Sequence, residues 1–282
     1  MDIEAGFENI RNNIKDGKYD MVLPEVRLIV ENSDDDVNIL IKCASLLKVV
    51  EEEAAFQEIL DSVMKILPEN EKERFDVSVA MRGLGRYEDA YSILRSLKEF
   101  VPDPYDTAMT YFCIEEYESA LEILLKVDDP DVRTSILLTE VYCSLGEFSK
   151  ADAVADSLIE KAGPTYDVLV NKCSVMFKRG ESKEAIKFAK SFLKEDKKNI
   201  DNLALNAYVM RINGRTPAAV NYCNRVLNTD FKHIGALETL ALCFIEKRSF
   251  VNAKLLAGAI NDADPGNPAV IRILDACRLL SS

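Results

Sequence analysis

The stretch Gly85-Arg86-Tyr87-Glu88-Asp89-Ala90 introduces a pattern that returns along most of the chain. A glycine suits the left-handed residue that ends one helix, and an alanine five residues later suits a close approach between that helix and the next. The pattern returns five times, with its alanines at Ala90, Ala120, Ala151, Ala185, Ala219 and Ala253. Successive alanines are 30, 31, 34, 34 and 34 residues apart, which predicts a solenoid of stacked helix pairs.

These residues resemble the tetratricopeptide repeat (TPR) family, whose repeat is a helix–turn–helix of 34 residues. Apolar positions of the preceding helix also match, as do the prolines that close several repeats: Leu203, Ala207, Met210, Pro68, Pro102 and Pro265. The resemblance covers nearly all of the chain. It implies an all-α fold, a right-handed α-solenoid superhelix of about eight TPR-like helix-turn-helix repeats with a C-terminal capping helix.

We expect one superhelical domain over residues 1–282. Its parts are two degenerate repeats, a series of clear repeats and a capping helix, at residues 1–69, 70–266 and 267–282. The short periods and nearby prolines predict a clipped first helix and a bend near residues 102–130, with a shortened loop and no bend as the alternative.

The second repeat, residues 35–69, has an ambiguous register. Its turn contains no glycine, and Phe56 falls where the pattern expects alanine. The turn could slip by a residue or two, with Ala54 or Ala55 taking the helix contact.

The charge of the chain is unevenly distributed around a net value of −13. Residues 1–141 contain 15 Lys and Arg against 32 Asp and Glu, whereas residues 142–282 contain 20 against 16. An acidic half disfavours nucleic-acid binding, because it repels phosphates. No apolar run approaches the roughly 18 residues of a membrane span.

The N-terminal sequence and the cysteine content favour a cytoplasmic protein. The start Met1-Asp2-Ile3-Glu4 lacks the basic and then apolar order of a secretory signal. The seven cysteines include no C-x-x-C pair, as expected for reduced, packed thiols.

The sequence contains few candidates for catalysis. His233 is the single histidine, and we expect it to be a surface residue. No phosphate-binding glycine loop occurs, and the acidic runs lack the spacing of a calcium loop. We therefore expect no catalytic residue, no metal site and no cofactor.

Two sets of basic residues are candidates for partner binding. Lys183, Lys187, Lys190 and Lys194 form a helical stripe that Lys197 and Lys198 extend. The resemblance places this stripe on the convex outside, where it either binds an acidic partner or is simply solvated.

A second basic row lies near the ends of the first helices, and the resemblance places it on the concave side. These cations either complement helix dipoles or bind acidic groups of an extended peptide. Asn171 matches an asparagine with which some family members hold a peptide backbone, but the family's carboxylate clamp cannot be placed in register. The candidate groove residues are Lys42, Arg82, Tyr105, Met109, Phe112, Asn171, Phe177, Lys178, Tyr208 and Arg211.

The sequence thus favours a non-enzymatic scaffold or adaptor that binds a peptide or helix of a partner protein in its concave groove. Two alternatives stay open. One is a self-associating assembly protein, a homo-oligomer, and the other is a regulatory or substrate-recruiting subunit of a separate enzyme. Neither nucleic acid nor a membrane is an expected partner.

Overall fold

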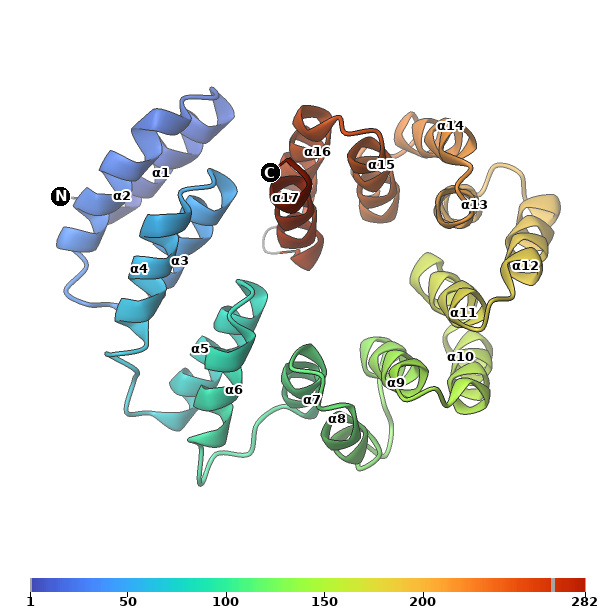
Figure 1. The fold of residues 1–282 in the computed structure, drawn as a ribbon, viewed down its shortest axis with the longest axis horizontal. Coiled ribbons are helices and arrows are strands. Elements are labelled where there is room, and N and C mark those ends of the chain that lie inside the picture. The colour runs from blue at the N-terminus through green and yellow to red at the C-terminus, as the bar shows by residue number, and fades with distance from the viewer. Residues whose placement is uncertain (1, 265–266, 282) are drawn as a thin grey trace. The chain divides into compact units, whose positions relative to one another are not determined.

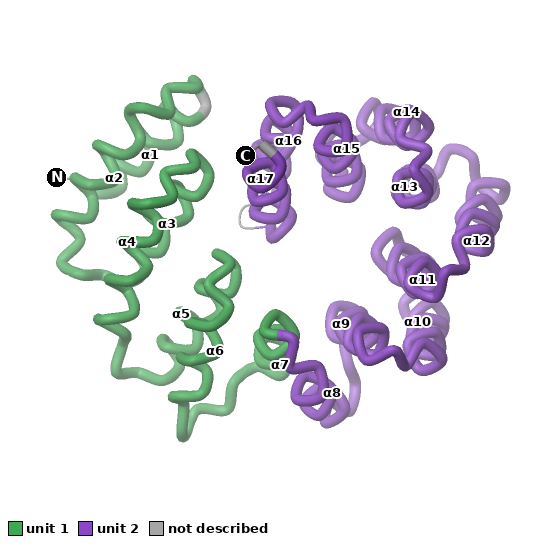
Figure 2. The backbone as a smooth tube through the Cα atoms, in the orientation of Figure 1, with its two compact units in different colours: residues 1–114 green, residues 115–282 purple. Residues whose placement is uncertain are grey.

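The structure, a computed structural model, describes residues 2–264 and 267–281. This part of the chain is all-helical, with 17 α-helices and one short 3-10 helix (Figure 1). The helices pack in consecutive pairs. The chain divides into two compact units, unit 1 at residues 1–114 and unit 2 at residues 115–282 (Figure 2), and each is described by itself.

Unit 1 contains three helix pairs and the first helix of a fourth. Its elements are α1 (Ile3–Lys15), η1 (Tyr19–Met21), α2 (Val22–Glu31), α3 (Val37–Val49), α4 (Glu53–Val63), α5 (Glu71–Gly83), α6 (Tyr87–Arg95) and α7 (Pro104–Cys113).

Unit 2 begins with the second helix of that pair and ends with a single helix. Its elements are α8 (Tyr117–Leu124), α9 (Val132–Ser144), α10 (Phe148–Ala162), α11 (Tyr166–Lys178), α12 (Ser182–Glu195), α13 (Ile200–Ile212), α14 (Thr216–Leu227), α15 (Ile234–Glu246), α16 (Phe250–Ala263) and α17 (Pro268–Ser281). In this unit α9, α11, α13 and α15 lie on the inner side of a curved row, and α10, α12 and α14 lie on the outer side (Figure 1).

The turn inside each pair begins with a left-handed residue. At Gly85 φ is 86°, and the next residue, Arg86, donates its N–H to the carbonyl of Met81 at 2.9 Å. This bond satisfies a carbonyl that the end of α5 leaves open. The left-handed backbone at this position therefore favours glycine, as its place in the sequence pattern predicts.

The second repeat makes the same turn without glycine. Glu51 has a φ of 64°, and Glu52 donates to the carbonyl of Leu47 at 3.0 Å. The expected slip of this turn is therefore wrong. Ala54 is exposed, and Phe56 is buried in the position where six other repeats have alanine. A non-glycine residue in this backbone region costs about 1–2 kcal/mol, which the packing of Phe56 helps to offset.

Small residues occupy the close contact between paired helices in the six repeats that carry the pattern alanine. The six pattern alanines are completely buried, at 0% exposure: Ala90, Ala120, Ala151, Ala185, Ala219 and Ala253. At the first of these the Ser78 hydroxyl on α5 donates to the carbonyl of Ala90 on α6 at 2.8 Å. Helix axes can approach this closely only where the side chain is small.

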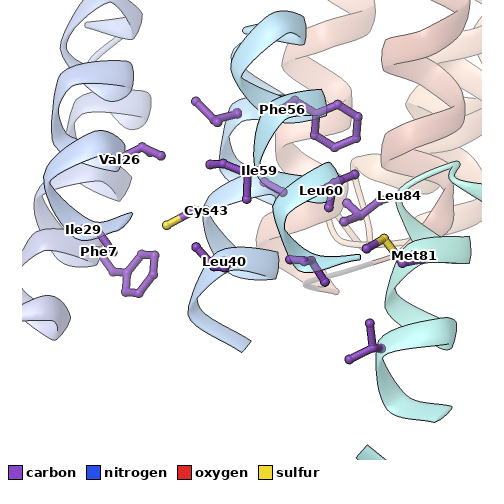
Figure 3. Packing of buried hydrophobic residues seen from close by; sticks show 14 of the residues in the cluster. Phe7, Val26, Ile29, Leu40, Cys43, Phe56, Ile59, Leu60, Met81 and Leu84 are labelled. Atoms are coloured by element: carbon purple, nitrogen blue, oxygen red, sulfur yellow. The ribbon is translucent and has the colours of Figure 1, made fainter. Parts of the chain in front are cut away.

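The core of unit 1 runs continuously across successive helix pairs. Figure 3 shows side chains from α1 to the end of α5 converging on one apolar layer, among them Phe7, Val26, Ile29, Leu40, Cys43, Phe56, Ile59, Leu60, Met81 and Leu84. Each pair thus buries its apolar surface against the next, as stacked repeats do.

Two predicted departures from the regular repeat are present. α7 has 10 residues, whereas α5 and α9 each have 13, so the expected shortening of this first helix is confirmed. α17 follows Asn267, whose Oδ1 accepts the N–H of Ala269 at 2.9 Å. Buried side chains of this helix include Ala269, Val270, Ile273, Leu274 and Cys277, and it packs on α15 and α16.

The alanine contact can be tested with two alanine-to-leucine variants. Ala90→Leu should lower the free energy of unfolding by about 1–3 kcal/mol, because the larger side chain forces α5 and α6 apart. Ala54→Leu is the control, since Ala54 is exposed and the change should stay within about 0.5 kcal/mol. Urea unfolding followed by circular dichroism measures both, and equal midpoints would refute the contact.

Candidate functional site

The ten predicted groove residues fall into two sets of five, one in each unit. In unit 1, Lys42 is exposed on α3, and its ammonium lies 5.6 Å from the centre of the Phe7 ring. Tyr105, Met109 and Phe112 are half-buried on α7.

Arg82, the fifth residue of the unit 1 set, links α5 to α7. One guanidinium nitrogen lies 2.5 Å from the Asp106 carboxylate, and the other donates to the Asp106 carbonyl at 2.5 Å and to the Thr110 hydroxyl at 3.1 Å. The side chain is only 11% exposed. Arg82 therefore holds two first helices together.

The unit 2 set lies on α11 and α13 and is joined by residues of α9 and α15. We define the α9–α15 face as Glu140, Asn171, Ser174, Phe177, Lys178, Tyr208, Arg211 and Glu246. Asn171, Ser174 and Lys178 are three and four residues apart on α11, so they share one side of that helix.

Both cations of this face are paired with a carboxylate of the neighbouring first helix. Lys178 forms an ion pair with Glu140, which also accepts a hydrogen bond from the Ser174 hydroxyl at 3.2 Å. Arg211 lies 3.0 Å from Glu246. The predicted basic row therefore consists, in unit 2, of ion pairs between successive repeats.

Asn171 is 3% exposed and lies between α9 and α11. Its Nδ2 donates to the Thr139 hydroxyl oxygen at 3.3 Å, and that hydroxyl donates in turn to the carbonyl of Ser135. The Asn171 Oδ1 is buried and has no hydrogen-bond partner among the described residues. Leaving a buried acceptor unpaired costs about 1–3 kcal/mol.

An aromatic pair joins α11 to α13. The rings of Phe177 and Tyr208 are half-buried, 6.3 Å apart and tilted by 61°, an edge-to-face arrangement. Burial raises the pKa of Tyr208 to about 12, although a hydrogen bond with Ser174 opposes this rise. The phenol is therefore a neutral donor at physiological pH.

A second feature of unit 2, an open cleft of about 600 Å³, lies where four first helices begin. The capping positions of α9, α11, α13, α15 and α17 are 34 residues apart, at Asp131, Thr165, Asn199, His233 and Asn267. This regular spacing brings the starts of α11, α13, α15 and α17 to one edge of the unit.

His233 caps α15 and lies inside this cleft. Its Nδ1 accepts the N–H of Ala236 at 3.2 Å, and its Nε2 lies 3.3 Å from the carboxylate of Asp201. The side chain is 9% exposed and its ring contacts that of Tyr166 at 5.2 Å. The expectation of a surface histidine is wrong, because the ring serves as a helix cap.

The cleft contains several carboxylates on successive first helices. Arg272 pairs with Glu238 at 2.7 Å. Burial and the nearby Asp201 raise the pKa of Asp167.

Tyr166 packs its ring on the backbone of Gly235, where an added Cβ would lie 2.1 Å from the ring.

Sequence reasoning identified the cations of the α9–α15 face but missed their acidic partners and the cleft. Glu140 precedes Lys178 by 38 residues, and Glu246 follows Arg211 by 35, each close to one repeat length. A search for opposite charges one repeat apart, and for capping residues at the 34-residue period, would have found both features.

The described residues supply no membrane-spanning helix, since none of their helices is both long and apolar enough. They also contain no group of three or more His, Cys, Asp or Glu side chains placed to hold a metal ion.

Comparison with solved structures identifies the fold. A tetratricopeptide repeat protein from Parabacteroides merdae ATCC 43184 matches with a TM-score of 0.51 and 14% identity, over 86% of this chain and 98% of that protein. TTC0263, a thermophilic TPR protein of Thermus thermophilus, gives a TM-score of 0.42 and 13% identity, over 61% of this chain and 96% of that protein. No protein-family model matches the chain, and no curated protein is significantly similar.

The chain therefore has the fold of a tetratricopeptide repeat protein. This agrees with the paired helices, the buried alanines and the left-handed turns described above.

The close contact at Gly235 can be tested with a matched pair of glycine variants. Gly235→Ala should lower the free energy of unfolding by about 1–3 kcal/mol, because the new methyl group displaces the Tyr166 ring. Gly258→Ala on α16 is the control, since its Cβ would meet nothing within 4 Å, and it should not destabilise the protein. Chemical unfolding monitored by tyrosine fluorescence compares them. Two variants of equal stability would contradict the packing described.

Proposed function

We propose that the protein is a non-enzymatic scaffold that binds a peptide or helix of a partner protein on the α9–α15 face. The fold supports protein–protein interaction in general, and the choice of face rests on its composition. One observation carries the proposal: the half-buried pair Phe177 and Tyr208 joins α11 to α13, and the ion pairs Lys178–Glu140 and Arg211–Glu246 join these same helices to α9 and α15. Aromatic anchors beside charged groups are typical of recognition surfaces.

The ion pairs of this face can exchange partners at low cost. Lys178 and Glu140 are 39% and 28% exposed, and such pairs contribute only about 0–1 kcal/mol to stability. A carboxylate of a bound peptide could therefore replace Glu140, and a basic side chain could replace Lys178. The expected ligand carries an apolar or aromatic residue for the Phe177–Tyr208 pair, with charged residues on either side.

Asn171 gives the proposal a second support. Its buried Oδ1 lacks a partner among the described residues, and a peptide N–H is a suitable donor for it. The neutral phenol of Tyr208 adds a donor for a peptide carbonyl.

The proposed setting is a reducing cytoplasm. Cys43, Cys173 and Cys223 are buried, and burial raises the pKa of each thiol to about 12. Thiols of this kind stay protonated and react slowly, so they need no disulfide partner.

Selection from a random peptide library on the purified full chain tests the proposal. Enriched peptides should contain an apolar residue flanked by charges. Phe177→Ala should weaken their binding by about tenfold or more, measured by isothermal titration calorimetry. Phe231→Ala is the control, because Phe231 is an aromatic residue of unit 2 that is 73% exposed outside this face.

A charge-swapped variant distinguishes a change in peptide binding from a loss of folding. Glu140→Lys combined with Lys178→Glu keeps an ion pair and should preserve stability, yet it should change the affinity for the selected peptides. The proposal fails if the library enriches no peptide, or if the enriched peptides bind both face variants as tightly as the original chain.

A further inference from the structure

A stripe of lysines lies on α12, one of the outer helices of unit 2. Lys183, Lys187, Lys190 and Lys194 are exposed on α12, and Lys197 and Lys198 follow its end. The first four are spaced by four, three and four residues, so they lie along one side of the helix. The opposite side of α12 is buried through Ala185 and Ala189.

These six lysines have no carboxylate partner among the described residues, unlike the cations of the inner side. Lys172, for comparison, pairs with Asp152 at 2.6 Å and with Asp156 at 2.5 Å. The two acidic residues of α12, Glu184 and Glu195, form no ion pair in the described part of the chain either. Like charges three or four residues apart on a helix destabilise it. The four lysines of α12 therefore repel one another, and no ion pair with an acidic side chain of the described chain offsets this repulsion.

A small cleft lies at the end of this stripe, between α12 and α14. Its volume is about 270 Å³, and it is lined by Lys190, Leu193, Lys194, Lys197 and Arg225. Four cationic residues thus surround one apolar side chain. A cleft of this size suits one or two side chains, since binding sites for whole small molecules are commonly about 300–1,000 Å³.

Arg225 is held in place at the edge of the cleft. Its Nη2 donates to the carbonyl of Lys197 at 3.4 Å, and its guanidinium lies 5.6 Å from the ring centre of Tyr222. A guanidinium oriented in this way is prepared to bind a carboxylate through two nitrogens.

Other anionic ligands fit this surface less well. Among the described residues, neither α12 nor α14 exposes a large apolar side chain, as helices that lie on membranes do. No exposed aromatic ring is available on these helices to stack a nucleic-acid base.

We propose that the lysine face, Lys183, Lys187, Lys190, Lys194, Lys197, Lys198 and Arg225, is a second binding surface that takes an acidic segment of a partner protein. Several Asp or Glu residues of that segment pair with the lysine stripe, and one apolar residue contacts Leu193 in the cleft. The chain then has two independent protein-binding surfaces, one on each side of unit 2.

The test uses a labelled peptide of alternating glutamates that carries one leucine, and a second peptide in which every glutamate is glutamine. Fluorescence anisotropy should give at least about tenfold tighter binding of the acidic peptide, and raising the salt from about 50 to about 200 mM should weaken it. Lys190→Glu with Lys194→Glu should lower that affinity by about tenfold or more. The control is Lys161→Glu with Lys232→Glu, which changes the net charge equally at exposed lysines elsewhere in unit 2.

Further measurements decide which kind of molecule binds the lysine face. Phe177→Ala should leave binding of the acidic peptide unchanged, which separates this surface from the proposed peptide site. Sedimentation that shows self-association, lost in the Lys190→Glu and Lys194→Glu variant, would support the proposal and identify a second copy as the acidic partner. Equal loss in the control variant, or tighter binding of anionic lipid vesicles or a single-stranded oligonucleotide, would overturn it.

Discussion

The close approach of two helices at one small residue, which six of the repeats make, is the contact on which the rest of the structure depends. The pattern alanines are completely buried, so the axes of each pair can meet there. The left-handed turn before the second helix aims it at this contact, and a bond such as that from Arg86 to Met81 fixes the turn. Because most pairs are held in this way, successive first helices align within each unit, and side chains one repeat apart come within reach of one another.

This alignment determines which charges are paired. Several cations pair with a carboxylate on a neighbouring first helix. In unit 2 these cations are Lys178, Arg211 and, on the last helix α17, Arg272; in unit 1 the cation is Arg82. The second helices are spaced by the same repeat, but α12 carries lysines where no described acid faces them. Unit 2 therefore has two chemically different surfaces: the inner side holds ion pairs and an aromatic pair, whereas α12 on the outer side presents unpaired lysines to solvent.

The sequence predicted the fold well, because its signals are local and repeated. Glycine, alanine and capping residues determine the structure of a single helix pair, and the same residues recur in most repeats. The second repeat was harder, since Glu51 adopts a conformation that its side chain disfavours and Phe56 replaces a small residue. Only the packing of neighbouring pairs selects that register, and a single repeat read alone does not contain it.

The candidate site was less predictable, for a physical reason. The resemblance placed Lys178 and Arg211 on one side, but their pairing with Glu140 and Glu246 depends on the crossing of helices and on side-chain conformation. His233 shows the same limit: a histidine in a loop looks exposed, and only the capped start of α15 buries it.

The central claim is that the cations of the inner side are held by carboxylates while those of α12 are unpaired. Acylation rates of individual lysines in the native chain, followed by mass spectrometry, measure this most directly. The account predicts that Lys172, 7% exposed between two aspartates, reacts slowest. Lys178 should react more slowly than Lys187, Lys190 and Lys194, and the differences should vanish in denaturant. Native rates for Lys172 and Lys178 that equal those of the α12 lysines would contradict it.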